Sequence, residues 1–134
     1  MTLNTLFASR PVMSKPHPTT VVELSLDGPC PVIRATGQLD AVGVTQLSDC
    51  CRDAHALSAP LVVLDLQSVT FIGSSSLGVL VGFVQHMHAR GHTVRALPFS
   101  APMTRAVNMV KLASLVEHFA TLDDAVANVN RLGD

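Results

Sequence analysis

A glycine followed by three serines, residues 73 to 76, separates two apolar stretches in the segment "FIGSSSLGVL". Small residues between a strand and a helix can serve three chemistries: a loop that cradles phosphate, a serine nucleophile on a tight turn, or a hydroxyl that receives a phosphate. A fourth interpretation assigns no chemistry, because serine hydroxyls also cap helices by accepting backbone N–H bonds. The flanking residues must distinguish these interpretations.

The phosphate-binding loop of nucleotide hydrolases is incomplete here. Gly73 and Gly78 match the beginning of G-x-x-x-x-G-K-[ST], but Val79 and Leu80 stand where the lysine and the hydroxyl residue belong. Without those side chains, no group reaches the terminal phosphates or binds magnesium, so the sequence argues against hydrolysis. A glycine loop without those side chains can still bind phosphate weakly. A nucleotide-binding or hydrolytic protein therefore stays open as a hypothesis, and it is the weakest of the three functions considered for this chain.

The serine-nucleophile interpretation fails at a different residue. The hydrolase elbow G-x-S-x-G requires a glycine where this chain has Leu77. Asp123, Asp124, His86 and His118 could supply a triad's acid and base, but nothing in their sequence context selects a set of three. A hydroxyl that accepts a phosphate needs no catalytic side chains beside it. It needs only to be exposed at the beginning of a helix.

The elements before the serines follow from the periodicity of the apolar residues. Residues 20–27 and 32–40 are rich in β-branched residues and are joined by "GPCP", which predicts a hairpin of two strands. A helix of about four turns then begins at residue 41 with Asp40 as its N-cap and ends before Pro60. The apolar run over residues 61–67, extended by "SVTFIG", predicts a central strand buried on both faces.

The second half of the chain continues the alternation. We expect five further elements: a helix to Gly91, a strand over 92–99, a short helix over 102–110, a short strand over 114–119 and a terminal helix over 121–132. This order predicts an α/β fold with a mixed, mostly parallel β-sheet, one antiparallel edge and about four helices. The glycine-serine segment then lies where a strand ends and a helix begins, the usual binding edge of such sheets.

Length and composition limit the class of protein. A chain of 134 residues fits one domain, which we expect over residues 19–134, after a flexible, proline-rich arm over residues 1–18. The net charge of −1 and the absence of Trp and Tyr argue against nucleic acid as a partner. The apolar runs are too short to cross a membrane, and the first residues do not resemble a secretory signal, so we expect a cytoplasmic protein.

Cysteine and histidine indicate no metal and no cofactor. The three cysteines, Cys30, Cys50 and Cys51, lack a CxxC spacing and are odd in number, which predicts reduced thiols in packing roles. His86 and His88 would point about 200° apart on a helix, so they cannot share a metal ion.

Two motifs carry a family resemblance. The segment "VVLDLQSVTFIGSSSLGVLVGF", residues 62–83, resembles the signature of the STAS domain of anti-sigma factor antagonists, roughly L-D-L-S-x-V-x-F-I-D-S-S-G-L-x-x-L. Upstream, "GQLD" at residues 37–40 is similar to the G-x-L-D that ends the second strand of that family. With the order of elements, the resemblance extends over most of residues 20 to 131.

The resemblance implies a single STAS domain without catalytic activity. Family antagonists bind an anti-sigma factor that is also a serine kinase, release the sigma factor, and are reset by a serine phosphatase. Phosphorylation of the first motif serine, here Ser74, ends the complex. The implied partner-docking residues are Asp40, Gly73, Ser74, Ser75, Ser76 and Leu77.

The chain differs from the family motif at two positions: Gly73 replaces the motif aspartate, and Ser76 replaces the motif glycine. These differences leave a second interpretation within the same fold. In it, the protein is a degenerate STAS scaffold or sensor that binds partners without phosphorylation.

Overall fold

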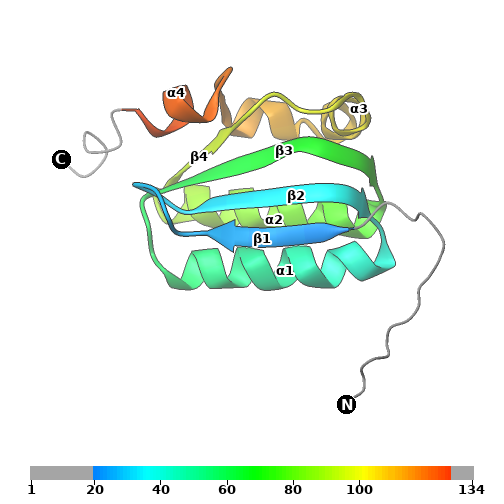
Figure 1. Ribbon diagram of the computed structural model, residues 1–134, viewed down its shortest axis with the longest axis horizontal. Coiled ribbons are helices and arrows are strands. Elements are labelled where there is room, and N and C mark those ends of the chain that lie inside the picture. The colour runs from blue at the N-terminus through cyan, green and yellow to red at the C-terminus, as the bar shows by residue number, and fades with distance from the viewer. Residues whose placement is uncertain (1–19, 128–134) are drawn as a thin grey trace, which may run out of the picture.

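The computed structural model describes residues 20–127, and Figure 1 shows a sheet with helices on both sides. The elements in chain order are β1 (Val21–Ser25), β2 (Val32–Leu39), α1 (Ala41–Ala56), β3 (Leu61–Ile72), α2 (Ser74–Ala89), β4 (Thr93–Ala96), α3 (Ala101–Val110), the 3-10 helix η2 (Leu112–Leu115), β5 (Glu117–His118) and α4 (Leu122–Val126). The predicted arm over residues 1–18 and the last residues of the predicted terminal helix lie outside the described range.

The sheet has the predicted α/β topology. Its five strands lie in the order β1-β2-β3-β4-β5, with β1 antiparallel to β2 and the other neighbours parallel. In Figure 1, α1 and α2 cover one face of the sheet, and α3 and α4 lie on the other. The mixed, mostly parallel sheet and its antiparallel edge are thus confirmed.

Strand β3 is the central strand, as the apolar run predicts. Its first four residues, Leu61–Leu64, are all buried, and side chains from α1, α2 and α3 pack against this sheet. Burial on both faces explains why this strand shows no alternation of polar and apolar residues at its start. None of the described helices is long and apolar enough to cross a bilayer.

The helix boundaries agree with the capping residues. The Asp40 carboxylate accepts hydrogen bonds from the backbone N–H groups of Val42 and Gly43, at 3.1 and 3.4 Å, and begins α1. Gly91 follows α2 with a φ of 75°, a conformation that glycine adopts without steric cost. At Gly43, an added Cβ would lie 2.8 Å from the Gln38 carbonyl oxygen, so glycine permits α1 to begin this close to β2.

Side chains of α1 occupy part of the free edge of β1. The Val22 N–H donates to Gln46 Oε1 at 3.0 Å, and the Cys50 thiol donates to the Val22 carbonyl at 3.6 Å. At the beginning of β1, the Thr20 hydroxyl donates to the Gln38 carbonyl at 2.9 Å. The chain therefore enters the domain beside the end of β2.

The strand predicted over residues 114–119 is present but shorter than expected. Only Glu117 and His118 pair with β4, while Ser114 and Leu115 belong to η2. Lys111 ends α3 in the left-handed conformation, with a φ of 59°, and its carbonyl accepts from the Ser114 hydroxyl at 2.9 Å. This local turn competes with strand pairing.

Candidate functional site

The glycine-serine segment joins the end of β3 to the beginning of α2. The Gly73 N–H donates to the Leu39 carbonyl at 3.0 Å, which ties the ends of β3 and β2 together. Gly73 is the N-cap of α2 and has no side chain to cap it. Interpreting the serines as cap residues is therefore wrong, because they form the first helical turn instead.

The three serines differ in exposure. Ser74 and Ser75 are exposed, whereas Ser76 is 1% exposed and its Oγ has no hydrogen-bond partner among the described residues. A helix turns by about 100° per residue, so the third serine faces the core when the first two face solvent. The inclusion of Ser76 among the surface docking residues needs correction: its hydroxyl is not accessible to a partner in this conformation.

Backbone N–H groups that have no acceptor within the described part of the chain lie at the same place. The first hydrogen bond within α2 runs from the Leu77 N–H to the Gly73 carbonyl at 3.0 Å. The three N–H groups before it, those of Ser74, Ser75 and Ser76, have no acceptor within the helix. Free amides and the helix dipole give such a terminus a partial positive charge. A phosphate on Ser74 or Ser75 would lie beside these donors.

A cavity of about 380 Å³ opens at this edge. It is lined by Asp40 and Val44 of the α1 start, by Phe71 at the end of β3, and by residues 73–76. The structure thus brings Asp40 together with the glycine-serine segment, as expected. Leu77 does not line this cavity and packs, half-buried, against the core.

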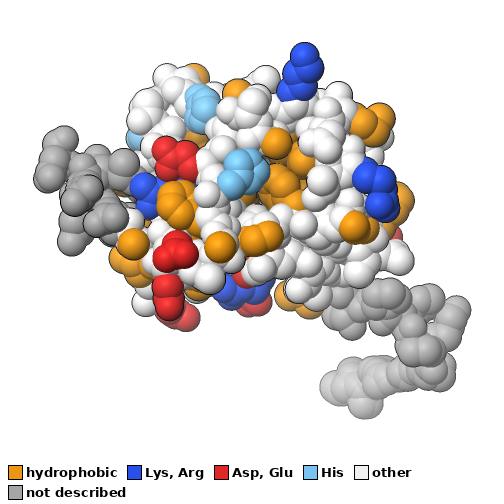
Figure 2. All heavy atoms as spheres, turned by 90° about the horizontal axis from the view of Figure 1, so that it is seen from above, with side chains coloured by type: hydrophobic (Ala, Val, Ile, Leu, Met, Phe, Trp, Pro, Cys, Tyr) orange, Lys and Arg blue, Asp and Glu red, His pale blue; other side chains and the backbone are white. Residues whose placement is uncertain are grey.

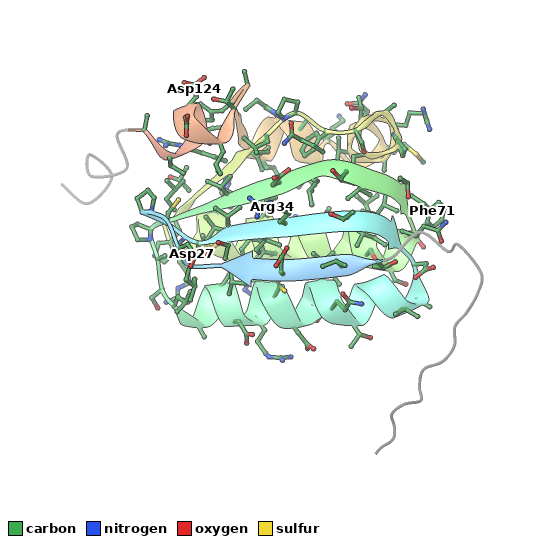
Figure 3. The ribbon with its side chains drawn as sticks, in the orientation of Figure 1. Asp27, Arg34, Phe71 and Asp124 are labelled. Carbon is green, nitrogen blue, oxygen red and sulfur yellow. The ribbon has the colours of Figure 1, made fainter. Side chains whose placement is uncertain are left out.

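Two apolar side chains at this edge were not predicted as part of the site. Phe71 is 49% exposed and Val42 is 66% exposed. Figure 3 shows Phe71 projecting at the end of the sheet where β3 finishes. In the sequence, Phe71 is marked only as a bulky apolar residue near the end of a predicted strand. The same pattern occurs in strands whose side chains are buried in the core.

The enzymatic interpretations gain no support from the geometry. Residues 74–78 are helical and form no loop around a phosphate. His86 lies twelve residues after Ser74 on the same helix, about 18 Å along its axis, and the His118 ring bonds the Ala113 carbonyl at 2.8 Å. Within residues 20–127, no three His, Cys, Asp or Glu side chains are grouped so that they could hold a metal ion.

Two pairs of charged side chains elsewhere in the sheet form ion pairs. Arg34, labelled in Figure 3, donates to Asp65 at 3.0 Å between β2 and β3. Arg95, 8% exposed, donates to Glu117 at 2.9 Å and to the Ala125 carbonyl at 2.8 Å. Asp65 therefore has a structural role, because its carboxylate ties β3 to the neighbouring strand β2.

The three cysteines are free thiols, as predicted. Burial raises the pKa of Cys30 and of Cys50, and it raises the pKa of the Cys51 thiol to about 12. All three thiols stay protonated at neutral pH, which makes them poor nucleophiles.

Comparison with known proteins gives a consistent result. A family model described as "STAS domain" matches residues 22–125. An anti-sigma factor antagonist from Mycobacterium paratuberculosis is 28% identical, with a TM-score of 0.69 over 88% of this chain and 99% of that one. The anti-sigma factor antagonist SpoIIAA in its unphosphorylated form shares the fold at 20% identity, with a TM-score of 0.70 over 83% of this chain and 97% of that one. A putative anti-sigma factor antagonist from Thermotoga maritima is similar in fold at 18% identity, with a TM-score of 0.67 over 84% of this chain and 95% of that one.

Proposed function

Because the chain belongs to the STAS domain family, we propose that it is an anti-sigma factor antagonist whose partner binding is ended by phosphorylation of Ser74. In this role it binds an anti-sigma factor with serine kinase activity and releases the sigma factor. A serine phosphatase restores the binding form. The chain itself performs no catalytic step, and the proposed location is the cytoplasm.

The position of Ser74 carries this proposal. It is the first residue of α2, its side chain is exposed, and no described residue bonds its hydroxyl. A kinase can reach such a hydroxyl without unfolding the helix. The product phosphate would interact favourably with the free amides of the first turn, so the modified protein keeps its fold.

The surroundings of Ser74 support a charge-based switch. Phe71 and Val42 offer apolar contact area to a partner, while Asp40 contributes one carboxylate beside the cavity. Phosphorylation adds a charge of roughly −1.5 to −2. A partner surface that matches the unmodified edge would then meet strong repulsion or an unpaired buried charge.

Lack of space does not explain why position 73 is glycine where the family motif has aspartate. A Cβ on Gly73 would lie 3.6 Å from the Leu39 carbonyl oxygen and 3.7 Å from the Phe71 ring, which is ordinary contact. The φ of −86° also suits any residue. An aspartate would therefore fit here, and its replacement by glycine lowers the negative charge beside the proposed acceptor.

The test uses purified anti-sigma factor kinases from the source organism. Each is mixed with the wild-type chain, Ser74→Ala, Ser74→Asp and the control Ser68→Asp, in which an exposed serine elsewhere on β3 acquires the same charge. Binding is measured by calorimetry, and phosphosites are mapped by mass spectrometry after incubation with Mg-ATP. We expect phosphate on Ser74, loss of binding by Ser74→Asp, and unchanged binding by Ser68→Asp.

Two outcomes would contradict the phosphoswitch. One is a Ser74→Asp variant that binds as tightly as the wild type, and the other is phosphate found only on Ser75. A partner that binds but never phosphorylates the chain supports the alternative, a degenerate STAS scaffold or sensor. The buried, unmatched Ser76 and the missing carboxylate at Gly73 are the observations that favour this alternative.

A further inference from the structure

The chain enters the domain beside the cavity of the Ser74 edge. The Thr20 hydroxyl donates to the Gln38 carbonyl at 2.9 Å, and Thr20 Cγ2 lies 3.1 Å from the place of a Cβ on Gly43. Leu39 Cδ2 lies 3.3 Å from the same place, and Leu39 lines the cavity of about 380 Å³ beside Ser74. The residues before Thr20 are therefore attached within about one side chain of this cavity.

The cavity and its rim offer apolar surface that no described residue covers. Four apolar residues contribute to the lining: Leu39, Ala41, Val44 and Phe71. Seven large apolar side chains are exposed in the described range, and Val21, Val42 and Phe71 are three of them. All three belong to the end of the sheet where β1 begins and where β2 and β3 finish (Figure 1). This edge therefore has the largest share of the exposed apolar side chains.

The chain itself contains an apolar segment that can reach this cavity. Leu3, Leu6 and Phe7 fall within five residues of one another, and Phe7 precedes Thr20 by thirteen residues. Thirteen residues of extended chain span at most about 45 Å, which is ample for a cavity next to Thr20. Residues 1–19 contain no Asp or Glu, so the Asp40 carboxylate beside the cavity does not repel them.

Covalent attachment favours this segment over a second copy of the chain. A segment on a short tether is present at an effective concentration in the millimolar range, far above a micromolar concentration of separate molecules. A contact made by two or three side chains, with an intrinsic Kd of about 1 mM, is then occupied about half of the time or more. The cavity volume also lies at the small end of ligand sites, roughly 300–1,000 Å³, and suits a few side chains.

We propose that residues 3–7 of the chain fold back onto the Ser74 edge as an autoinhibitory segment. Leu6 and Phe7 occupy the cavity against Val44 and Phe71, and a partner must displace them before it docks. Contact between the segment and the edge does not depend on the proposed function. Its effect on an anti-sigma factor does rest on that function.

The first test is amide NMR of the full chain. The wild type is compared with the triple variant Leu3→Ser, Leu6→Ser and Phe7→Ser, and we expect the amide shifts of Val42 and Phe71 to change. The matched control is Val12→Ser with Met13→Ser, which removes apolar side chains from residues outside the proposed contact. In the control, the edge should keep its wild-type shifts.

A peptide guards against an indirect effect of the triple variant. A synthetic peptide of residues 1–12, titrated into the triple variant, should restore the wild-type shifts at the edge with a Kd in the millimolar range. The same peptide should leave the amide of Met109, an exposed apolar residue on α3, unchanged. Calorimetry should then show that the triple variant binds an anti-sigma factor about threefold more tightly than the wild type does, because no segment has to be displaced.

Several results would overturn the proposal. It fails if the edge has the same shifts in the triple variant as in the wild type, if the control changes them equally, or if the peptide causes no saturable shift. Edge shifts that depend on protein concentration would assign the contact to a second copy and overturn a contact within one chain. If the shifts behave as expected but no anti-sigma factor binds, the contact stands and the proposed function fails.

Discussion

Ser76 shows how one residue in a repeated run acquires a different role. Its hydroxyl is buried and has no partner among residues 20–127, at the position where the family motif has glycine. An unsatisfied buried hydroxyl costs free energy, and serine is also a weaker helix former than alanine.

We therefore expect Ser76→Ala to raise the free energy of unfolding by about 1 kcal/mol, measured by urea denaturation. Ser75→Ala is the matched control, because the same atom is removed from an exposed neighbour, and its effect should be smaller. A loss of stability in Ser76→Ala would mean that the hydroxyl has a partner, such as bound water.

Cys51 predicts a pH dependence of stability. Its folded pKa of about 12 lies above the ordinary value of 9.0, because burial disfavours the thiolate. Its contribution to stability is complete below pH 9 and is lost progressively as the pH rises from about 9 toward about 12, where only the unfolded chain ionises.

Between pH 9 and about 12, ionisation of the Cys51 thiol in the unfolded chain should lower the free energy of unfolding by at most about 1.4 kcal/mol per pH unit. Urea denaturation at pH 8, 9 and 10 measures the slope, and Cys51→Ala should have a shallower slope despite its lower starting stability. Equal slopes in the two proteins would show that the buried thiol does not govern this window.

At the scale of elements, Arg95 connects three segments. From β4 it reaches Glu117 of β5 and the Ala125 carbonyl at the end of α4, and its guanidinium lies 4.9 Å from the centre of the Phe119 ring. The hydrogen bond from Arg95 to the Ala125 carbonyl is buried, whereas the Glu117 side chain is largely exposed.

Replacing Arg95 with methionine keeps the apolar stem and removes the donors. We expect a loss of about 2 kcal/mol, the typical value for a hydrogen bond from a charged group with its acceptor left unpaired. Glu117→Gln should cost well under 1 kcal/mol, because an exposed ion pair contributes little. Thermal unfolding of both variants gives the comparison, and equal losses would place the energy in the ion pair instead.

The elements differ in how well the sequence predicts them. The start of α1 at Asp40, the buried strand β3 and the stop at Gly91 follow from capping and apolar pattern alone. The segment around Ser114 does not, because apolar residues occur both in a short strand and in a 3-10 turn. The left-handed Lys111 that decides between them is a conformation that sequence periodicity does not reveal.

At the scale of the whole molecule, the proposed docking surface is assembled from four separate elements. The end of β2, the beginning of α1, the end of β3 and the beginning of α2 meet at one edge, as parallel strands require. Proximity of Asp40 and Ser74 was therefore predictable. Burial of Ser76 was not, since it depends on how α2 is rotated about its axis against the sheet. Exposure of Phe71 was not either, since an apolar residue near the end of a strand is equally compatible with a place in the core.

The same assembly predicts the effect of removing the apolar contacts. Phe71→Ala and Val42→Ala should each weaken partner binding about tenfold or more while leaving the thermal midpoint nearly unchanged, because exposed side chains contribute little to the core. Met109→Ala, at an 83% exposed apolar position on α3, is the control. If all three variants bind like the wild type, the docking surface lies elsewhere.

Figure 2 views the face that carries α3 and α4, where apolar, acidic and histidine side chains are interspersed. Ala125 packs with Val32 and Leu61, at the opposite end of the parallel strands from Ser74. The Thr20–Gln38 bond, in contrast, fixes the point where the chain enters the domain next to the Ser74 edge. A bulky fusion partner or purification tag joined on a short linker before Thr20 would thus shield the proposed phosphorylation site, whereas one joined after Ala127 would leave it open.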